Sequence, residues 1–309
     1  MVLGKTTGDH EVLKACFDQS RRLAIAVGPG ANRNAFAGGA LVSIRERNLH
    51  HKVAAWGGCS SGIATCGYIA GSGSREDTKV FSHDTNDHRL LSVWRWFLGK
   101  PMFDVDYADR VFQGIETGRG INATRVIESG IPFYAILSDP NTGQHLVFRA
   151  ETPDEVHQLA SVGAAVTGIS RKVYFRGREV SDGFFTLANF PLEAIVEQCR
   201  QEGRGVPTDI LVFAGKHLDP QPKRKRWSVE LAHLLGLARY SEPVRRLMKD
   251  RYIHFYEAHE RALVRTDIRV LVVWNPTKLP AFKIPKEESE KLIETGYQTM
   301  EHLFRSLGR

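Results

Sequence analysis

Short apolar runs alternate with glycine-rich loops and helical segments along the first part of the chain. Residues 22–27 (RLAIAV) and 52–56 (KVAAW) are apolar enough to form buried strands. Residues 35–47 and 63–71 have the pattern of helices, and their small residues allow neighbouring backbone to pack closely. This order of strand, loop, helix, strand, turn and helix predicts a parallel sheet with helices on its faces.

The second half of the chain continues the mixed α/β pattern. Residues 131–150 place DPNTG between two apolar runs, and residues 173–182 place Arg-Gly between two more, so each segment is predicted to be a β-hairpin. Further buried strands are predicted at 209–214 and 269–274, and further helices at 11–20, 191–203 and 286–307.

The middle of the chain is predicted to be helical. Residues 88–99 (HRLLSVWRWFLG) and 108–115 carry apolar residues at helical spacing, which predicts that their aromatic side chains join the core. No internal repeat or low-complexity linker divides the sequence. We therefore expect one domain over residues 1–309, with residues 1–20 as an N-terminal helical extension.

Composition narrows the class of protein only slightly. Of the 309 residues, 42% are hydrophobic and 25% charged, as in soluble globular proteins, and the formal charge is +7. This excess favours anionic partners such as lipid interfaces, nucleic acid or acidic metabolites. No secretory h-region is present, and no apolar run approaches the roughly 20 residues of a bilayer span. We expect a cytoplasmic protein that meets lipid, if at all, from the aqueous side.

Metal and redox chemistry receive no support from the sequence. No HExxH motif, CxxC pair or zinc-ligand spacing is present. We therefore expect no metal, no cofactor and four reduced thiols, on Cys16, Cys59, Cys66 and Cys199.

The clearest chemical motif is GxSxG at residues 58–62, between a predicted strand and a predicted helix. A nucleophilic serine needs an exposed hydroxyl on a sharp strand-to-helix turn, and Gly58 and Gly62 permit such a turn around Ser60. The positive end of the following helix would lie near a developing oxyanion. Cys59 is expected to point the opposite way, as a small buried residue.

A second motif is the loop at residues 28–34 (GPGANRN), after the first strand. Glycine-rich βα loops present backbone N–H groups to anions, so the loop could cradle a phosphate or form an oxyanion hole for Ser60. It lacks the Lys-Ser/Thr of a P-loop and the third glycine of GxGxxG. The third motif, Asp182-Gly183, follows a predicted hairpin strand and on its own is typical of a turn.

In this order the three motifs resemble the patatin-like phospholipase family. That family has a GGGxRG-type oxyanion loop, an early GxSxG elbow and an aspartate followed by glycine. Residues 29–41 (PGANRNAFAGGAL) align without gaps on the first motif, and the C-terminal residues from 274 are similar to bacterial members. The resemblance covers roughly residues 20 to 305.

The resemblance implies a patatin-like three-layer α/β/α fold with a central, mostly parallel sheet. It also implies a serine acyl hydrolase that cleaves lipid esters through a Ser60–Asp182 dyad and an acyl-enzyme, without a cofactor. The oxyanion hole would comprise residues 30–33, that is Gly30, Ala31, Asn32 and Arg33. Its partners would be a lipid ester substrate and the surface of an anionic membrane, and no nucleic acid is expected.

Several residues depart from the family pattern. Pro29, Ala31 and Asn34 stand where the family has glycine, and the aspartate motif reads DGF. Proline has no N–H, which leaves Gly30 and Ala31 as the expected oxyanion donors. Asparagine tolerates a positive φ better than most residues, so we expect that conformation at Asn34.

Two alternative hypotheses about the function remain open. One is an ordinary α/β-hydrolase with a Ser–His–Asp triad, although that fold usually places its serine after more than two strands. The other is a degenerate patatin module that binds lipid or nucleic acid without catalysis, as the altered loop and basic charge suggest. The basic run 223–226 with Trp227 is either a solvated loop or a docking site for anionic lipid.

Overall fold

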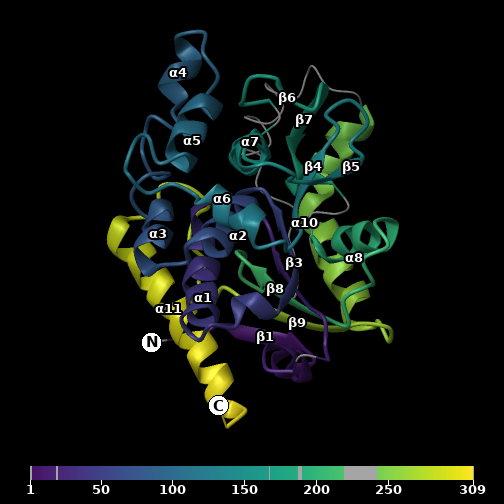
Figure 1. The fold of residues 1–309 in the computed structure, drawn as a ribbon. Coiled ribbons are helices and arrows are strands. Elements are labelled where there is room, and N and C mark those ends of the chain that lie inside the picture. Colours follow the sequence, from purple (N-terminus) through teal and green to yellow (C-terminus); the bar gives the residue numbers. More distant parts are fainter. Residues whose placement is uncertain (1, 19, 167, 187–189, 219–241, 309) are drawn as a thin grey trace.

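The computed structural model describes residues 2–18, 20–166, 168–186, 190–218 and 242–308. Its centre is a nine-stranded sheet in the order β1-β9-β8-β2-β3-β4-β7-β6, with β5 paired to β4 beside this path. The strands are β1 (Lys5–Gly8), β2 (Leu23–Val27), β3 (Val53–Cys59), β4 (Phe133–Ser138), β5 (His145–Arg149), β6 (Val173–Phe175), β7 (Arg178–Asp182), β8 (Asp209–Ala214) and β9 (Arg269–Trp274). The five central strands are parallel and the others join antiparallel, which confirms the predicted sheet (Figure 1).

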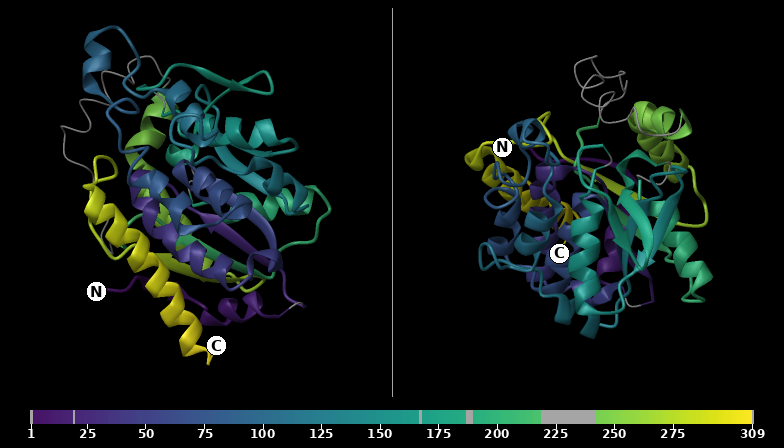
Figure 2. Two further views of the ribbon diagram at one scale, coloured as in Figure 1. Left: turned by 60° about the vertical axis from the view of Figure 1, so that its left-hand side comes forward. Right: turned by 90° about the horizontal axis from the view of Figure 1, so that it is seen from above.

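Helices cover both faces of the sheet. In β2, Leu23, Ile25 and Val27 join one core, whereas Ala24 and Ala26 join the other, because successive strand residues point to opposite faces. The first face packs against α1 (Ala35–Glu46), α2 (Ser61–Gly71), α5 (Val105–Phe112), α6 (Ala123–Glu128), α7 (Pro153–Gly163) and α11 (Lys286–Ser306). The second packs against α8 (Leu192–Gln201) and α10 (Glu242–Leu263), which gives the predicted three layers (Figures 1 and 2).

Short helices lie in the segments between these elements. They are α3 (Arg75–Thr78), α4 (Val93–Phe97), and the 3-10 helices η1 (His10–Cys16), η2 (Ala31–Asn34), η3 (His50–Lys52), η4 (Lys79–Phe81) and η5 (Gly183–Phe185). Among the described helices, none combines the length and the apolar character needed to cross a membrane.

The small residues of α1 have the predicted packing role. A Cβ atom on Gly39 would lie 1.9 Å from the carbonyl oxygen of Ile293 in α11, and one on Gly296 would lie 2.0 Å from that of Phe36. The two helices therefore meet backbone to backbone, and glycine is required on both sides of the contact.

The expected N-terminal helical extension is wrong in its first part. Residues Lys5–Gly8 form β1, which pairs antiparallel with β9 at the edge of the sheet. The following segment is helical, but it is the 3-10 helix η1, which begins after Asp9 caps the amide of Glu11. The buried side chains of Val12 and Leu13 attach this segment to the core.

The expectation of a long buried helix at 88–99 is also wrong. Only Val93–Phe97 form a helix, α4, and the side chains of Trp94, Trp96, Phe97 and Leu98 are exposed rather than packed in the core. In contrast, Phe112 of α5 is buried as predicted, and Tyr107, which lies just before the predicted segment, is buried as well.

Candidate active site

The strand-to-helix turn at Ser60 has the geometry of a nucleophile elbow. Ser60 lies between β3 and α2 with φ +58° and ψ −136°, a strained conformation for a residue with a side chain. A Cβ on Gly58 would lie 2.5 Å from the backbone of Gly62, and one on Gly62 would lie 2.2 Å from the carbonyl oxygen of Val27. Both glycines are therefore needed for this turn. Ser60 is partly exposed, whereas Cys59 is buried as expected.

Asp182 is the hydrogen-bond partner of the elbow serine. The Ser60 hydroxyl donates to Asp182 Oδ2 at 2.7 Å, and the Phe184 amide donates to Asp182 Oδ1 at 2.9 Å. The Asp182 side chain is buried, whereas Ser60 reaches solvent. The structure thus brings together two residues that are 122 positions apart in the sequence.

A short backbone ladder places Asp182. The end of β7 pairs with the end of β4 through Leu137↔Asp182 and Ser138↔Ser181 alone. The buried Ser138 hydroxyl donates to the Asp182 carbonyl at 2.8 Å, and the Asp182 amide donates to the Ala165 carbonyl at 2.9 Å. Gly183 is required next, because a Cβ there would lie 2.5 Å from the carbonyl oxygen of Ile136.

Burial gives Asp182 a pKa suited to a base at neutral pH. Loss of solvent raises the pKa of its carboxyl group to about 7, which is partly opposed by the Ser60 hydrogen bond, the Phe184 amide and the positive charge of Lys216. Lys216 follows the end of β8 and is itself buried, with its Nζ 3.8 Å from the ring centroid of Phe255. A base with a pKa near the working pH is favourable for proton transfer.

Lys216 was not anticipated from the sequence. Ligands of open α/β sheets bind outside the carboxyl ends of the strands, so a lysine two residues after a buried strand could have been recognised as part of the site. We expect Lys216→Met to move the acid limb of the pH–activity profile to higher pH, because removing the positive charge raises the pKa of Asp182 further. The measurement is kcat/KM against pH for an ester substrate.

The matched control for Lys216 is Lys291→Met on α11, a lysine that pairs with Glu288 at 2.7 Å on an exposed surface. In this variant the acid limb of the pH–activity profile should keep its wild-type midpoint. A folded Lys216→Met protein whose acid limb keeps the wild-type midpoint would show that Lys216 does not act on the Asp182 carboxyl group.

The loop at 28–34 is tied to the elbow through Asn34. Its side-chain amide donates to the Gly28 carbonyl at 3.0 Å and to the Ser61 hydroxyl at 2.8 Å. Its Oδ1 is buried without a hydrogen-bond partner in the described part of the chain. A Cβ on Gly30 or on Gly215 would lie 2.2 Å or 2.0 Å from this oxygen, so both glycines make room for it.

The four predicted oxyanion residues differ in what their amides bind. The Asn32 amide donates to the Ala281 carbonyl at 3.0 Å, and the Arg33 amide donates to the Gly30 carbonyl at 3.2 Å, so both are engaged elsewhere. The amides of Gly30 and Ala31 have no acceptor among the described residues. The Ser61 amide at the start of α2 also has none there, as is usual for a first helical turn.

The expected positive φ lies at a different residue of this loop. Ala31 has φ +50°, whereas Asn34 has φ −70° and a helical conformation. Ala31 thus occupies the position at which glycine would be free of strain. Asn34 contributes through its side chain instead.

Histidine does not contact Ser60 in the described part of the chain. His259 binds the Thr7 hydroxyl at 2.9 Å, and burial lowers its pKa to about 4. His254 lies 3.6 Å from Glu257 on the same helix. His233 and the basic run 223–226 with Trp227 lie outside the described residues.

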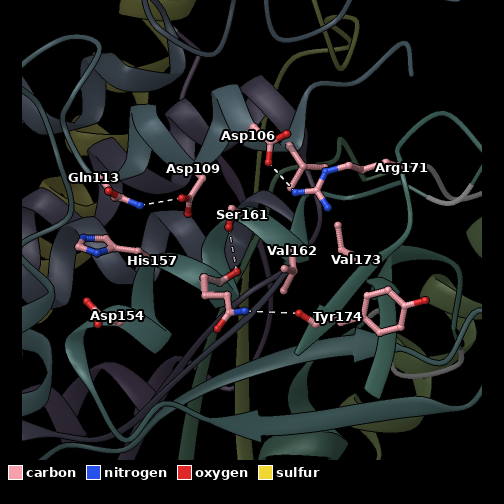
Figure 3. A pocket seen from close by; sticks show the side chains of 12 residues that line it. Asp106, Asp109, Gln113, Asp154, His157, Ser161, Val162, Arg171, Val173 and Tyr174 are labelled. Atoms are coloured by element: carbon pink, nitrogen blue, oxygen red, sulfur yellow. Dashed lines mark hydrogen bonds and ion pairs between the residues drawn. The ribbon is translucent and has the colours of Figure 1, made fainter. Parts of the chain in front are cut away.

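A separate polar cavity lies between α5 and α7. It has a volume of about 550 Å³ and includes Asp106, Asp109, His157 and Arg171 in its lining (Figure 3). Arg171 forms an ion pair with Asp106 across its rim. Neither Ser60 nor Asp182 lines it, and no sequence motif indicates it.

Comparison with solved structures finds distant structural similarity. No protein-family model and no curated protein matches the chain. The crystal structure of VipD from Legionella pneumophila superposes with a TM-score of 0.48 over 93% of this chain and 67% of its own, at 9% sequence identity. Values this low assign neither family nor activity, so the functional proposal rests on the residues of this chain.

Proposed function

We propose that this protein is a patatin-type serine acyl hydrolase that cleaves carboxylic esters of lipids. The observation that supports this most strongly is the 2.7 Å hydrogen bond from Ser60 Oγ, on a strained elbow, to the buried carboxylate of Asp182. The choice of lipid as substrate follows from the sequence resemblance to patatin-like phospholipases.

Acylation uses the residues that the fold has assembled. Asp182 accepts the Ser60 proton while Oγ forms a bond to the ester carbonyl carbon. The amides of Gly30, Ala31 and Ser61 are the candidate donors to the resulting oxyanion. Collapse of the tetrahedral intermediate breaks the bond to the alcohol, which leaves with the proton from Asp182. The acyl group remains on Ser60.

Deacylation repeats the same proton transfers with water. Asp182 accepts a proton as the water oxygen attacks the acyl carbon, and the tetrahedral intermediate again uses the oxyanion donors. When the bond to Ser60 breaks, Oγ recovers the proton and the carboxylic acid is released. One carboxylate therefore serves as base and acid in both halves of the reaction.

The two rival functions make different demands on this site. A Ser–His–Asp triad needs an imidazole between serine and carboxylate, whereas here the carboxylate binds Ser60 directly. A non-catalytic module would not need a serine activated in this way. An activity probe therefore separates the proposal from the second rival.

A fluorophosphonate should label Ser60 and no other residue, because only an activated hydroxyl reacts readily with it. We expect intact-mass analysis to show one adduct on the wild type and none on Ser60→Ala, with peptide mapping to locate it.

The control is Ser72→Ala at the other end of α2. The Ser72 hydroxyl also donates to a carboxylate, that of Asp77, at the same distance of 2.7 Å, but it does not lie on an elbow. This variant should be labelled like the wild type. Labelling that survives Ser60→Ala, or its absence from folded wild-type protein, would contradict the proposal.

A further inference from the structure

Four large apolar side chains are exposed together on one short projection. This aromatic tip comprises residues 94–98 (WRWFL), in which Trp94 is 76%, Trp96 51%, Phe97 67% and Leu98 74% exposed. The Phe97 ring centroid lies 5.7 Å from that of each tryptophan. Contiguous exposed apolar surface of this kind usually marks an interaction site.

The aromatic tip is held on a well-anchored base. Leu91 and Phe103 form a β-bridge, and the Phe103 and Leu90 side chains are buried in the core. The Phe103 amide donates to the Ile169 carbonyl at 2.9 Å. Arg95 turns back from the tip, donating to the Pro101 carbonyl at 3.0 Å and pairing with Asp104 at 2.9 Å. The apolar side chains are therefore presented by an ordered structure.

The charged side chains within the projection itself are all basic. Residues 88–103 include Arg89, Arg95 and Lys100 and no carboxylate. At the base, Asp87 and Glu116 pair with Arg89, and Asp104 pairs with Arg95. Lys100 is exposed and has no carboxylate partner among the described residues. The outer part of the projection thus combines aromatic rings with the uncompensated positive charge of Lys100.

This combination fits a lipid bilayer better than a protein surface. A stable protein interface involves about 20 to 30 residues on each side, far more than the tip offers. Tryptophan is enriched at the membrane–water interface, and exposed lysine and arginine are attracted to anionic headgroups. Apolar side chains clustered on a five-residue helix can enter a fluid phase without needing a complementary surface.

The aromatic tip also lies at a suitable end of the molecule. Figure 1 shows α4 projecting at the end that carries β6 and β7, and the left view of Figure 2 shows the same projection from another side. Asp182 is the last residue of β7. A bilayer that meets the aromatic tip would therefore face the end of the sheet at which the dyad is built.

We propose that the aromatic tip inserts into the interfacial region of an anionic lipid bilayer and brings the enzyme to its aggregated substrate. The inference rests on the proposed function for the identity of that substrate. The insertion itself is independent of catalysis, so the two can be tested separately.

The test measures partition of the full chain onto vesicles of phosphatidylcholine with phosphatidylserine. Trp94→Ser/Phe97→Ser should lower the partition coefficient by at least about tenfold, since each ring would otherwise bury apolar area in the interface. The control Val2→Ser/Val264→Ser removes two side chains that are 74% and 78% exposed elsewhere, and it should partition like the wild type. Lys100→Glu should weaken partition onto anionic vesicles more than onto neutral ones.

Insertion has its own spectroscopic readout. Lipids brominated on the acyl chain should quench the fluorescence of the wild type, and Trp94→Phe/Trp96→Phe should bind with most of that quenching lost. Both proteins carry Trp227→Phe, so that this tryptophan outside the described residues does not contribute, and Trp56 and Trp274 are buried and would not be reached. Quenching that persists undiminished in this variant would overturn the assignment of the tip.

The remaining outcomes separate this inference from the proposed function. If wild type binds vesicles but hydrolyses no ester, the proposed function fails and the membrane site stands. If the tip variant keeps hydrolysis of a soluble short ester but loses that of vesicle lipid, both are supported. Unchanged vesicle binding by the tip variant overturns the inference. So does concentration-dependent dimerisation that the tip variant abolishes in a wild type that does not bind vesicles.

Discussion

Replacing Asp182 by asparagine is expected to lower kcat/KM for a short nitrophenyl ester about a thousandfold or more, on the scale of losing a triad member. Asparagine keeps the shape of the side chain and can accept the Phe184 amide hydrogen bond, but it cannot accept the proton of Ser60. The loss should match that of Ser60→Ala, and the double variant should be no worse than either single one, because the two residues act as a unit. Circular dichroism would verify folding.

Histidine substitutions test the alternative that a histidine, rather than Asp182, is the catalytic base. Single alanine variants at five histidines downstream of the elbow should each retain most of the activity, namely those of His217, His233, His254, His259 and His302. His259 is the most demanding of these, because it packs 4.8 Å from the Trp274 ring and its loss leaves a gap in the core. If a folded histidine variant lost about a thousandfold in kcat/KM, the site would be a triad that includes this histidine rather than a Ser60–Asp182 dyad.

The pH dependence is the second large effect. Burial raises the pKa of Asp182 from 3.8 to about 7, and only the ionised carboxylate can accept the serine proton. We therefore expect kcat/KM to rise about tenfold per pH unit below pH 7 and to level off above it, which makes the enzyme about a hundredfold slower at pH 5 than at its plateau.

The histidine variants distinguish this profile from one caused by imidazole, whose ordinary pKa lies in the same region. The acid limb should remain in each of them if Asp182 is the titrating group. Activity that stays constant down to pH 5 in folded wild-type protein would mean that the carboxyl group keeps an ordinary pKa and that its burial has no effect on the reaction.

Much of this fold could be predicted because a buried parallel strand has a recognisable pattern. The segments of β2, β8 and β9 are continuous apolar runs, as expected of strands covered on both faces. In contrast, β1 reads KTTG, which is short and polar, and only its pairing with β9 makes it a strand. The spacing of aromatic residues in 93–98 likewise indicated which side chains lie together, but it did not indicate whether they are buried or exposed.

The sequence predicted the site residues only where they belong to a local motif. The elbow glycines follow from the GxSxG spacing, and their contacts with backbone show why no other residue fits. The approach of Asp182 to Ser60 was inferred from family resemblance, since spacing alone cannot bring together residues of two distant strands. The Lys216 charge and the Asn34 side-chain bridge depend on tertiary neighbours that no motif encodes.

The two-residue ladder between β4 and β7 has a consequence for how the enzyme would fail on heating. Segments with few backbone hydrogen bonds open at a lower free-energy cost than the body of a sheet. Detachment of β7 would carry Asp182 away from Ser60 while the five parallel strands remained folded. Loss of the proposed activity would then precede loss of structure, and its resistance to heat would depend on this short ladder rather than on the stability of the whole molecule.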